Sequence, residues 1–412
     1  VASGFNSIGI QSSGGVGKVV ADWIKDRKPP MDLADVDIKR MMPFQSNKNY
    51  LYDRTVETLG LLYAMHWPYY QNTTARNARK TILHDRIAKA GAFWSETAGW
   101  ERPAFFVTDS DNFEINYSYG RQNWFKYVDQ ECKNMIENVG LFDQSPFPKF
   151  LLQGKDACKV LNHIVSNNID VEIGKVVYTQ MLNHDGGIEA DITVIRQAAD
   201  EFMIVTAAAA QTRDFSWIKK HIPADSHAFL TDITAGLPMI GLMGPKSRAL
   251  LEKLTGADLG NDAFPFGTSQ EHEIGYARVR LNRLTYVGEL GWEIYIPGEF
   301  ATHVYDLLVE AGKEFGLGHC GYFAMNACRL EKGYRHWGHD IAGEDTPVEA
   351  GLAFACDFTK DGGFIGLEAV KAQKEAGIPS KRLIQIQLED DSETAALMYH
   401  EEPIYRNGEI VG

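Results

Sequence analysis

The hydrophobic pattern in the second half of the chain predicts several strands. A continuous apolar run at residues 202–205 predicts a buried strand. Strict alternation of apolar and charged residues at 277–281 predicts a strand with one exposed face. After a turn at Gly288, Glu293 and Tyr295 fall on one face of the next strand, and the neighbouring apolar residues fall on the other. We interpret the face that carries Glu293 and Tyr295 as the polar face of that strand.

Helical spacing predicts helices at residues 301–313 and at roughly 322–333, so the chain beyond Phe142 mixes both element types. We expect a new strand-rich stretch to start near Lys381. Asn407-Gly408, close to the end, is a hairpin signal. The sequence stops shortly afterwards, so we expect a strand without its partner and a truncated end. We find no internal repeat and no low-complexity segment.

Three glycines, Gly14, Gly15 and Gly17, precede apolar residues at helical spacing, and Pro29-Pro30 follows them. We interpret the glycines as a tight turn that leads into a helix. Backbone N–H groups at such a helix start can meet an anion or a carbonyl oxygen. A phosphate-binding loop is not supported, because Val19 stands where that motif needs Ser or Thr.

Composition narrows the possible functions. With 412 residues the chain exceeds the roughly 250–300 at which a single core stops growing, so more than one core is expected. A net charge of −14 argues against a nucleic-acid partner. The five cysteines contain no CxxC pair, and the His336/His339 pair has no third ligand nearby, so we predict no metal site. No apolar run approaches the ~18 residues of a membrane span.

Three blocks of sequence together resemble one family, the dimethylglycine and sarcosine dehydrogenases. The first block, residues 4–24, resembles the last flavin-binding segment of D-amino-acid-oxidase-like amine dehydrogenases. The second, Gly99-Trp100-Glu101-Arg102-Pro103, is similar to the short linking domain of the family. The remainder resembles the aminomethyltransferase fold, also called the glycine-cleavage T-protein fold. Its cues are the runs at residues 140–143, 186–191, 286–293 and 329–334.

The resemblance implies an α+β fold in four parts. Residues 1–45 would be the C-terminal remnant of a flavin-dependent oxidoreductase domain, and residues 46–103 the linking domain. Residues 104–380 would be the aminomethyltransferase-like folate domain, and residues 381–412 the start of a truncated C-terminal β-barrel. The chain is then expected to be a fragment that lacks the amino-terminal FAD-binding unit of the family. Its remaining share of the flavin site would be Gly4, Asn6, Ser7 and Gly9.

The family implies two cofactors, FAD and tetrahydrofolate. Oxidation of a small methylamine releases a one-carbon unit, which tetrahydrofolate traps as 5,10-methylenetetrahydrofolate. A carboxylate near the folate nitrogens would guide protonation and stabilise developing positive charge. Asp191 is our candidate, because it follows the Gly186-Gly187 turn and begins the β-branched run of a strand. Without the resemblance, a strand-capping aspartate is the better interpretation.

The remaining folate contacts are inferred from the same motifs. Glu289 would anchor the pterin, because one carboxylate can accept two adjacent N–H groups. Tyr286, Glu293 and Tyr295 would line the site around it. Arg329 lies among apolar residues and must be paired, either by folate or by an internal partner such as Glu331 or Asp340.

Two alternatives from other classes remain. One is a folate-dependent O- or S-demethylase of the methyltransferase type, which residues 4–24 count against. The other is a non-catalytic protein similar to the regulatory subunit of pyruvate dehydrogenase phosphatase. The Thr206-Ala207-Ala208-Ala209 run departs from the Ser-Asn-Ala-Gly stretch of the T-protein and favours the fused dehydrogenases. The resemblance leaves the electron acceptor open, and it implies a cytoplasmic location in bacteria or the mitochondrial matrix in eukaryotes.

Overall fold

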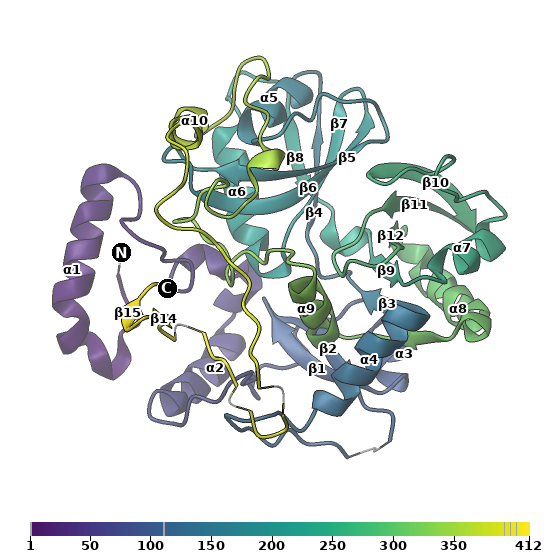
Figure 1. The fold of residues 1–412 in the computed structure, drawn as a ribbon, viewed down its shortest axis with the longest axis horizontal. Coiled ribbons are helices and arrows are strands. Elements are labelled where there is room, and N and C mark those ends of the chain that lie inside the picture. Colours follow the sequence, from purple (N-terminus) through teal and green to yellow (C-terminus); the bar gives the residue numbers. More distant parts are fainter. Residues whose placement is uncertain (1, 110–111, 391, 396, 401) are drawn as a thin grey trace.

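The computed structural model describes residues 2–109, 112–390, 392–395, 397–400 and 402–412. Two sheets form its centre, and each packs helices against its outer face (Figure 1). Both helices and strands are present throughout the central region, as an α+β fold requires. No helix in these described ranges is both long and apolar enough to cross a membrane.

The first sheet has five antiparallel strands in the order β5-β6-β7-β4-β8. Ile192 and Val194, two alternate residues of β6, are buried against helices α5 and α6. This packing explains why β-branched residues recur along the strand. The predicted buried strand at 202–205 is confirmed. The elements are β4 (Lys149–Gln153), α5 (Ala157–Ile164), β5 (Val176–Leu182), β6 (Ile188–Ala198), β7 (Glu201–Val205), α6 (Gln211–His221) and β8 (Phe229–Asp232).

The second sheet has six strands in the order β10-β11-β12-β9-β3-β13, of which only the β13–β3 pair is parallel among the described strands. Helices α7 and α8 cover one face, where Trp292 and Ile294 are fully buried. The predicted helices and the half-exposed strand at 277–281 are confirmed. The elements are α4 (Phe125–Glu137), β3 (Val139–Asp143), β9 (Met239–Met243), α7 (Ser247–Thr255), β10 (Thr268–Ile274), β11 (Ala277–Arg283), β12 (Gly291–Tyr295), α8 (Ala301–Gly312), β13 (Leu317–His319) and α9 (Tyr322–Glu331). Helix α10 (Leu367–Glu375) packs instead on the β5–β6 end of the first sheet.

The inner faces of the two sheets pack against each other. Ile195 and Met203 of the first sheet share a buried cluster with Met239 and Tyr295 of the second. Residues two apart along a strand share a face, so side chains on the same side as Ile195 and Tyr295 point into the space between the sheets.

The same strand–glycine–helix unit occurs in each of the two sheets. Gly154 joins β4 to α5, and Gly244 joins β9 to α7, each with a φ of 127°. A Cβ at Gly154 would lie 2.1 Å from the carbonyl oxygen of His227, and one at Gly244 would lie 2.4 Å from that of Asn138. Only glycine fits either turn.

The N-terminal part of the chain reaches from the surface into the core: its first long helix has no buried residue, whereas Ile87 and Phe105 are buried. Its elements are η1 (Asn6–Ile8), α1 (Gly9–Asp26), α2 (Lys48–Leu61), α3 (His84–Lys89), β1 (Ala92–Thr97) and β2 (Trp100–Phe106). Helix α1 has no buried residue and forms one edge of the molecule (Figure 1). The expected glycine turn is wrong: Gly14, Gly15 and Gly17 lie inside α1, because a glycine in a helix costs only about 1 kcal/mol and need not end it.

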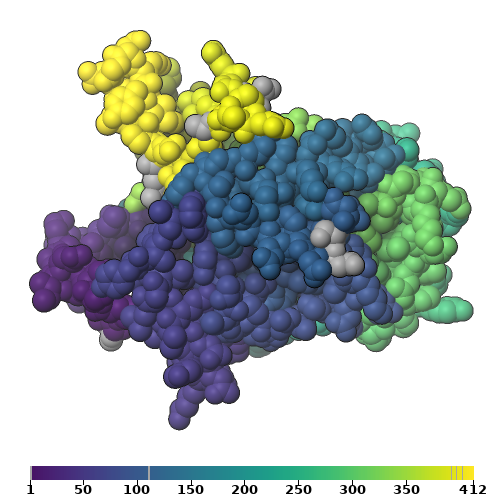
Figure 2. All heavy atoms as spheres, turned by 90° about the horizontal axis from the view of Figure 1, so that it is seen from below, coloured from purple at the N-terminus to yellow at the C-terminus, as the bar shows by residue number. Residues whose placement is uncertain are grey.

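The C-terminal stretch also differs from the expectation. No strand forms between residues 381 and 404 in the described part, and the apolar side chains there, such as Ile384, remain exposed because no core lies beneath them. Asn407-Gly408 does form the predicted hairpin, between β14 (Tyr405–Arg406) and β15 (Glu409–Ile410). The expected unpartnered strand therefore has a partner. This segment projects from the body of the molecule (Figure 2).

Candidate active site between the two sheets

Asp191 lies on β6 and faces the space between the two sheets, on the same side as Ile195. Its carboxylate accepts two hydrogen bonds, from the Tyr178 hydroxyl at 2.8 Å and from Gln180 Nε2 at 2.9 Å. The side chain is partly exposed, but protein surrounds it closely enough that desolvation raises the pKa of Asp191 to about 6. The two hydrogen bonds oppose that rise. The carboxyl can therefore change protonation state near neutral pH.

The position of Asp191 corrects the expectation that it starts its strand. Strand β6 begins three residues earlier, at Ile188, so Asp191 stands directly opposite Gln180 of β5. This pairing holds the carboxylate from the neighbouring strand. Sequence reasoning missed Tyr178 and Gln180, although a glutamine inside an apolar strand was a usable signal.

Two further side chains approach Asp191 from the second half of the chain. Arg335, in the loop after α9, lies close enough that its positive charge opposes the rise in the pKa of Asp191. Burial raises the pKa of the Tyr286 hydroxyl, and the negative charge of Asp191 adds to that rise. The Tyr286 hydroxyl donates to the carbonyl oxygen of Arg335 at 2.9 Å. The structure thus brings together two of the predicted site residues, Asp191 and Tyr286, and adds Arg335.

Arg329 has an internal partner, as one of the sequence alternatives required. The guanidinium is 3% exposed and forms an ion pair with Asp340. It also donates to the carbonyl oxygen of Tyr334 at 3.0 Å and to Asn326 Oδ1 at 2.9 Å. These contacts hold the end of α9 against the loop that carries Arg335. The alternative partner Glu331 is exposed.

Glu293 lies on the inner face of the second sheet, opposite the sheet that carries Asp191. Its carboxylate accepts a hydrogen bond from the Tyr295 hydroxyl at 2.6 Å, and burial raises the pKa of Glu293 to about 7. Lys149 of β4 is fully buried nearby, and burial lowers the pKa of its ammonium group to about 7. The face predicted to be polar is thus buried between the sheets, not solvated.

Glu289 has a different environment from the other predicted residues. It lies in the loop between β11 and β12, partly exposed, with its carboxylate 3.5 Å from Lys332 Nζ. Gly288 beside it adopts a φ of 84°, and a Cβ there would collide with the Lys332 side chain. This loop therefore packs tightly on the end of α9.

The faces between the sheets carry buried amide atoms that no protein group satisfies. Gln180 Oε1, Gln144 Oε1 and both amide atoms of Asn282 have no hydrogen-bond partner within the described residues. Asn282 stands directly opposite Glu293 across the β11–β12 pair, and the Gln144 side chain covers Gly241 on the other side of Glu293. An unpaired buried polar atom costs on the order of 1–3 kcal/mol. This donor and acceptor set fits the polar edge of a flat heterocycle such as a pterin.

The four predicted flavin contacts do not form an enclosed site among the described residues. Gly4, Asn6 and Ser7 are exposed, Gly9 is partly exposed, and the Ser7 hydroxyl bonds to the Tyr63 hydroxyl at 2.5 Å. They offer one open surface, which does not enclose a flavin.

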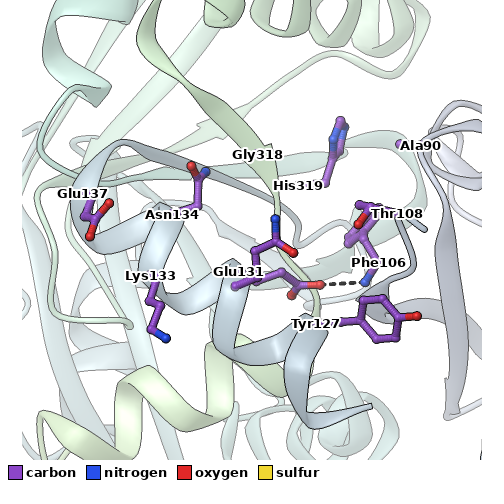
Figure 3. A pocket seen from close by; sticks show the side chains of 11 residues that line it. Ala90, Phe106, Thr108, Tyr127, Glu131, Lys133, Asn134, Glu137, Gly318 and His319 are labelled. Carbon is purple, nitrogen blue, oxygen red and sulfur yellow. Dashed lines mark hydrogen bonds between the residues drawn. The ribbon is translucent and has the colours of Figure 1, made fainter. Parts of the chain in front are cut away.

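A cavity of about 470 Å³ lies elsewhere, between α4, β2 and β13. Glu131 points into this region and accepts the backbone N–H of Phe106 at 2.6 Å (Figure 3) and that of Gly321 at 2.8 Å. Burial raises the pKa of Glu131 to about 8. Its two bonds tie the end of β2 to the start of α9, so we assign it a structural role. None of the predicted folate contacts lines this cavity.

Comparison with known proteins places this geometry in context. The family described as the GCVT N-terminal domain matches residues 83–360, and the FAD dependent oxidoreductase central domain matches residues 28–81. In the solved structures, the chain is similar to glycine cleavage system aminomethyltransferase T from Bartonella henselae. The TM-score is 0.61 at 25% identity, with 73% of this chain and 75% of that chain covered.

Three curated relatives match over nearly the whole chain. A formaldehyde-forming 4-methylaminobutanoate oxidase of Paenarthrobacter nicotinovorans is 42% identical, covering 100% of this chain and 49% of that protein. The mitochondrial pyruvate dehydrogenase phosphatase regulatory subunit of Mus musculus is 34% identical, covering 100% and 48%. Mitochondrial sarcosine dehydrogenase of Homo sapiens is 34% identical, covering 99% and 48%. The chain spans about half the length of these relatives.

The fold thus agrees with the matched families. The chain belongs to the GCVT N-terminal domain family, in the group that joins this domain to an FAD dependent oxidoreductase central domain and includes the sarcosine and dimethylglycine dehydrogenases.

Proposed function

We propose that this chain binds a reduced folate between its two sheets and takes part in oxidative N-demethylation of a small methylamine, with 5,10-methylenetetrahydrofolate as the product. Sarcosine, dimethylglycine and related N-methyl amines are the substrate class. The observation that carries the proposal is the Asp191 carboxyl, held by Tyr178 and Gln180, with its pKa raised to about 6.

The reduced folate, when bound, supplies the nitrogen atoms that accept the carbon. The protein's part is electrostatic. At neutral pH most Asp191 is ionised, so it can accept a proton from a folate nitrogen and stabilise a positive charge that develops there. Tyr178 and Gln180 fix the carboxylate in one orientation, which is what such a group needs to act.

The other predicted residues take binding roles in this proposal. Glu293 and Tyr295 would meet the pterin from the opposite sheet, and Tyr286 would close the site beside Asp191. Glu289 would act at the mouth of the site, because it lies in the partly exposed loop that leads to β12. Arg329 would act through its ion pair with Asp340, which holds the loop carrying Arg335.

Asp191→Asn in the complete enzyme tests the catalytic role. The substitution keeps the shape and removes the charge, so carbon delivery to folate should fall by about 10²-fold. Amine-dependent flavin reduction should stay near the parent rate, and free formaldehyde should accumulate. Formaldehyde and methylenetetrahydrofolate are measured at saturating folate. Carbon delivery at the parent rate would leave Asp191 with only a structural role.

Two variants control this test. Asp185→Asn removes an exposed carboxylate from the turn before β6, where it pairs with Lys28, and should change neither product. Glu289→Gln should weaken folate binding, so its defect should shrink as the folate concentration rises. A non-catalytic protein similar to the phosphatase regulatory subunit would show no amine-dependent turnover with any of these variants.

A further inference from the structure

Gln180 is the most completely buried polar residue beside Asp191, with none of its surface exposed. Both polar groups of its backbone bond to Ser166: the Ser166 N–H donates to the Gln180 carbonyl oxygen at 2.8 Å, and the Ser166 hydroxyl accepts the Gln180 N–H at 3.2 Å. The side chain is therefore held on a rigid edge strand that pairs only with β6 among the described strands.

The two polar atoms of the Gln180 side-chain amide differ in their hydrogen bonding. Nε2 donates to Asp191 Oδ1 at 2.9 Å, but Oε1 has no partner in the described protein. Turning the amide over would place Oε1 against the carboxylate oxygen, so the hydrogen-bond network sets the orientation. Because oxygen and nitrogen of an amide point in different directions, Oε1 is aimed away from Asp191 and needs an N–H or O–H donor.

We propose that Gln180 has two functions: its Nε2 positions Asp191, and its Oε1 accepts a hydrogen bond from an N–H group of the bound reduced folate. This inference rests on the proposed function. One residue would then couple ligand recognition to the orientation of the carboxylate. Tyr178 does only the first of these jobs: its hydroxyl donates to Asp191 Oδ2, and, unlike Gln180 Oε1, it is not a buried polar atom without a hydrogen-bond partner.

A comparison of Gln180→Met with Tyr178→Phe separates the two functions. Both variants remove one hydrogen bond that stabilises ionised Asp191, so both should move the pH inflection of carbon transfer above that of the parent. Only Gln180→Met removes the acceptor for the ligand, so it should weaken binding of 5-formyltetrahydrofolate by about tenfold. Tyr178→Phe should change that affinity by less than about threefold.

The charged and titratable groups that face Asp191 are Tyr178 on β5, Arg335 after α9 and Tyr286 before β12, and all three remain in Gln180→Met. A shift in the pH inflection therefore reports the lost Gln180 bond. Calorimetry of the chain with 5-formyltetrahydrofolate gives the affinities, and the complete enzyme gives the pH profile of carbon transfer.

The outcomes distinguish this inference from the function on which it rests. No binding of the folate by the parent chain would overturn the proposed function itself. Parent-like affinity in Gln180→Met, with the parent binding normally, would overturn only the role of Oε1. An unshifted pH profile would overturn the positioning role. If Gln180→Met does not fold, Gln180→Glu keeps an acceptor while adding a negative charge beside Asp191. It should then retain affinity within about threefold and still raise the pH inflection.

Discussion

At the scale of single residues, Asp191 is placed for chemistry at a cost in stability. Its pKa is raised to about 6, above the ordinary value of an aspartate, because protein surrounds the carboxyl. The folded state then binds a proton more tightly than the unfolded state. Stability contributed by the neutral form is complete below the unfolded pKa and is lost as pH rises through about 6.

The same residue therefore yields a prediction about unfolding. Asp191→Asn removes the buried charge, so the variant should be more stable than the parent at pH 8, by about 1 kcal/mol after allowance for its partial exposure. The difference should vanish near pH 4, where the parent carboxyl is largely protonated. Urea unfolding at both pH values measures this, with Asp185→Asn as the exposed control. Equal stability at pH 8 would show that the carboxylate is well solvated.

At the scale of elements, glycine has opposite effects on stability in different parts of the chain. Gly14, Gly15 and Gly17 lie within exposed helix α1, and a Cβ at any of them would meet no atom within 4 Å. At Gly154, by contrast, the φ of 127° and the close His227 carbonyl exclude any other residue. The first group weakens a helix, whereas the second permits a turn.

Gly15→Ala should consequently strengthen α1 without affecting the rest of the protein. Alanine is favoured over glycine in a helix interior by about 1 kcal/mol, so amide exchange in α1 should slow by roughly fivefold. The global unfolding midpoint should not move, because α1 has no buried residue. Gly154→Ala is the contrasting variant and should lower that midpoint. A loss of global stability in Gly15→Ala would reveal a contact of α1 that restricts its glycines.

At the scale of the whole molecule, the two proposed cofactors have unequal support from the described residues. Of the proposed folate contacts, Asp191 comes from one central sheet, and Glu293 and Tyr295 come from the other. The flavin contacts lie together on the exposed start of one peripheral helix (Figure 1). A large cofactor needs walls on several sides, and these residues supply one surface.

We therefore expect the chain to purify without colour even when FAD is supplied. The same preparation should bind tetrahydrofolate with a dissociation constant at about the micromolar level. Absorbance between 350 and 500 nm after dialysis, roughly the range of flavin absorption, checks the first expectation, and calorimetry checks the second. Stoichiometric, dialysis-resistant FAD would show that residues 4–24 form a larger part of a flavin site than this geometry indicates.

The sequence by itself determined the strands at 202–205 and 277–281, the strand after Gly288 and the helices at 301–313 and 322–333, because these follow from local periodicity. Motifs in continuous stretches also led to the candidate residue Asp191. The sequence also identified the family. Local reasoning was wrong at the three glycines of α1, since it interpreted them as a turn, although a glycine inside a helix costs only about 1 kcal/mol and need not end it. It was also wrong after Lys381, where an alternating pattern found no core to pack on.

Only the tertiary structure decided which side chains share the site. Asp191 and Glu293 are far apart in sequence, yet their side chains face each other's sheet. Each lies an even number of residues along its strand from a residue packed at the interface, Ile195 for Asp191 and Tyr295 for Glu293, and so points to the same side. Gln180 meets Asp191 through the register of β5 with β6. Arg329 forms its ion pair with Asp340, because the chain after α9 folds back onto the helix. Glu331, the other candidate partner, is exposed to solvent. Face and register depend on contacts between distant segments, which no local pattern contains.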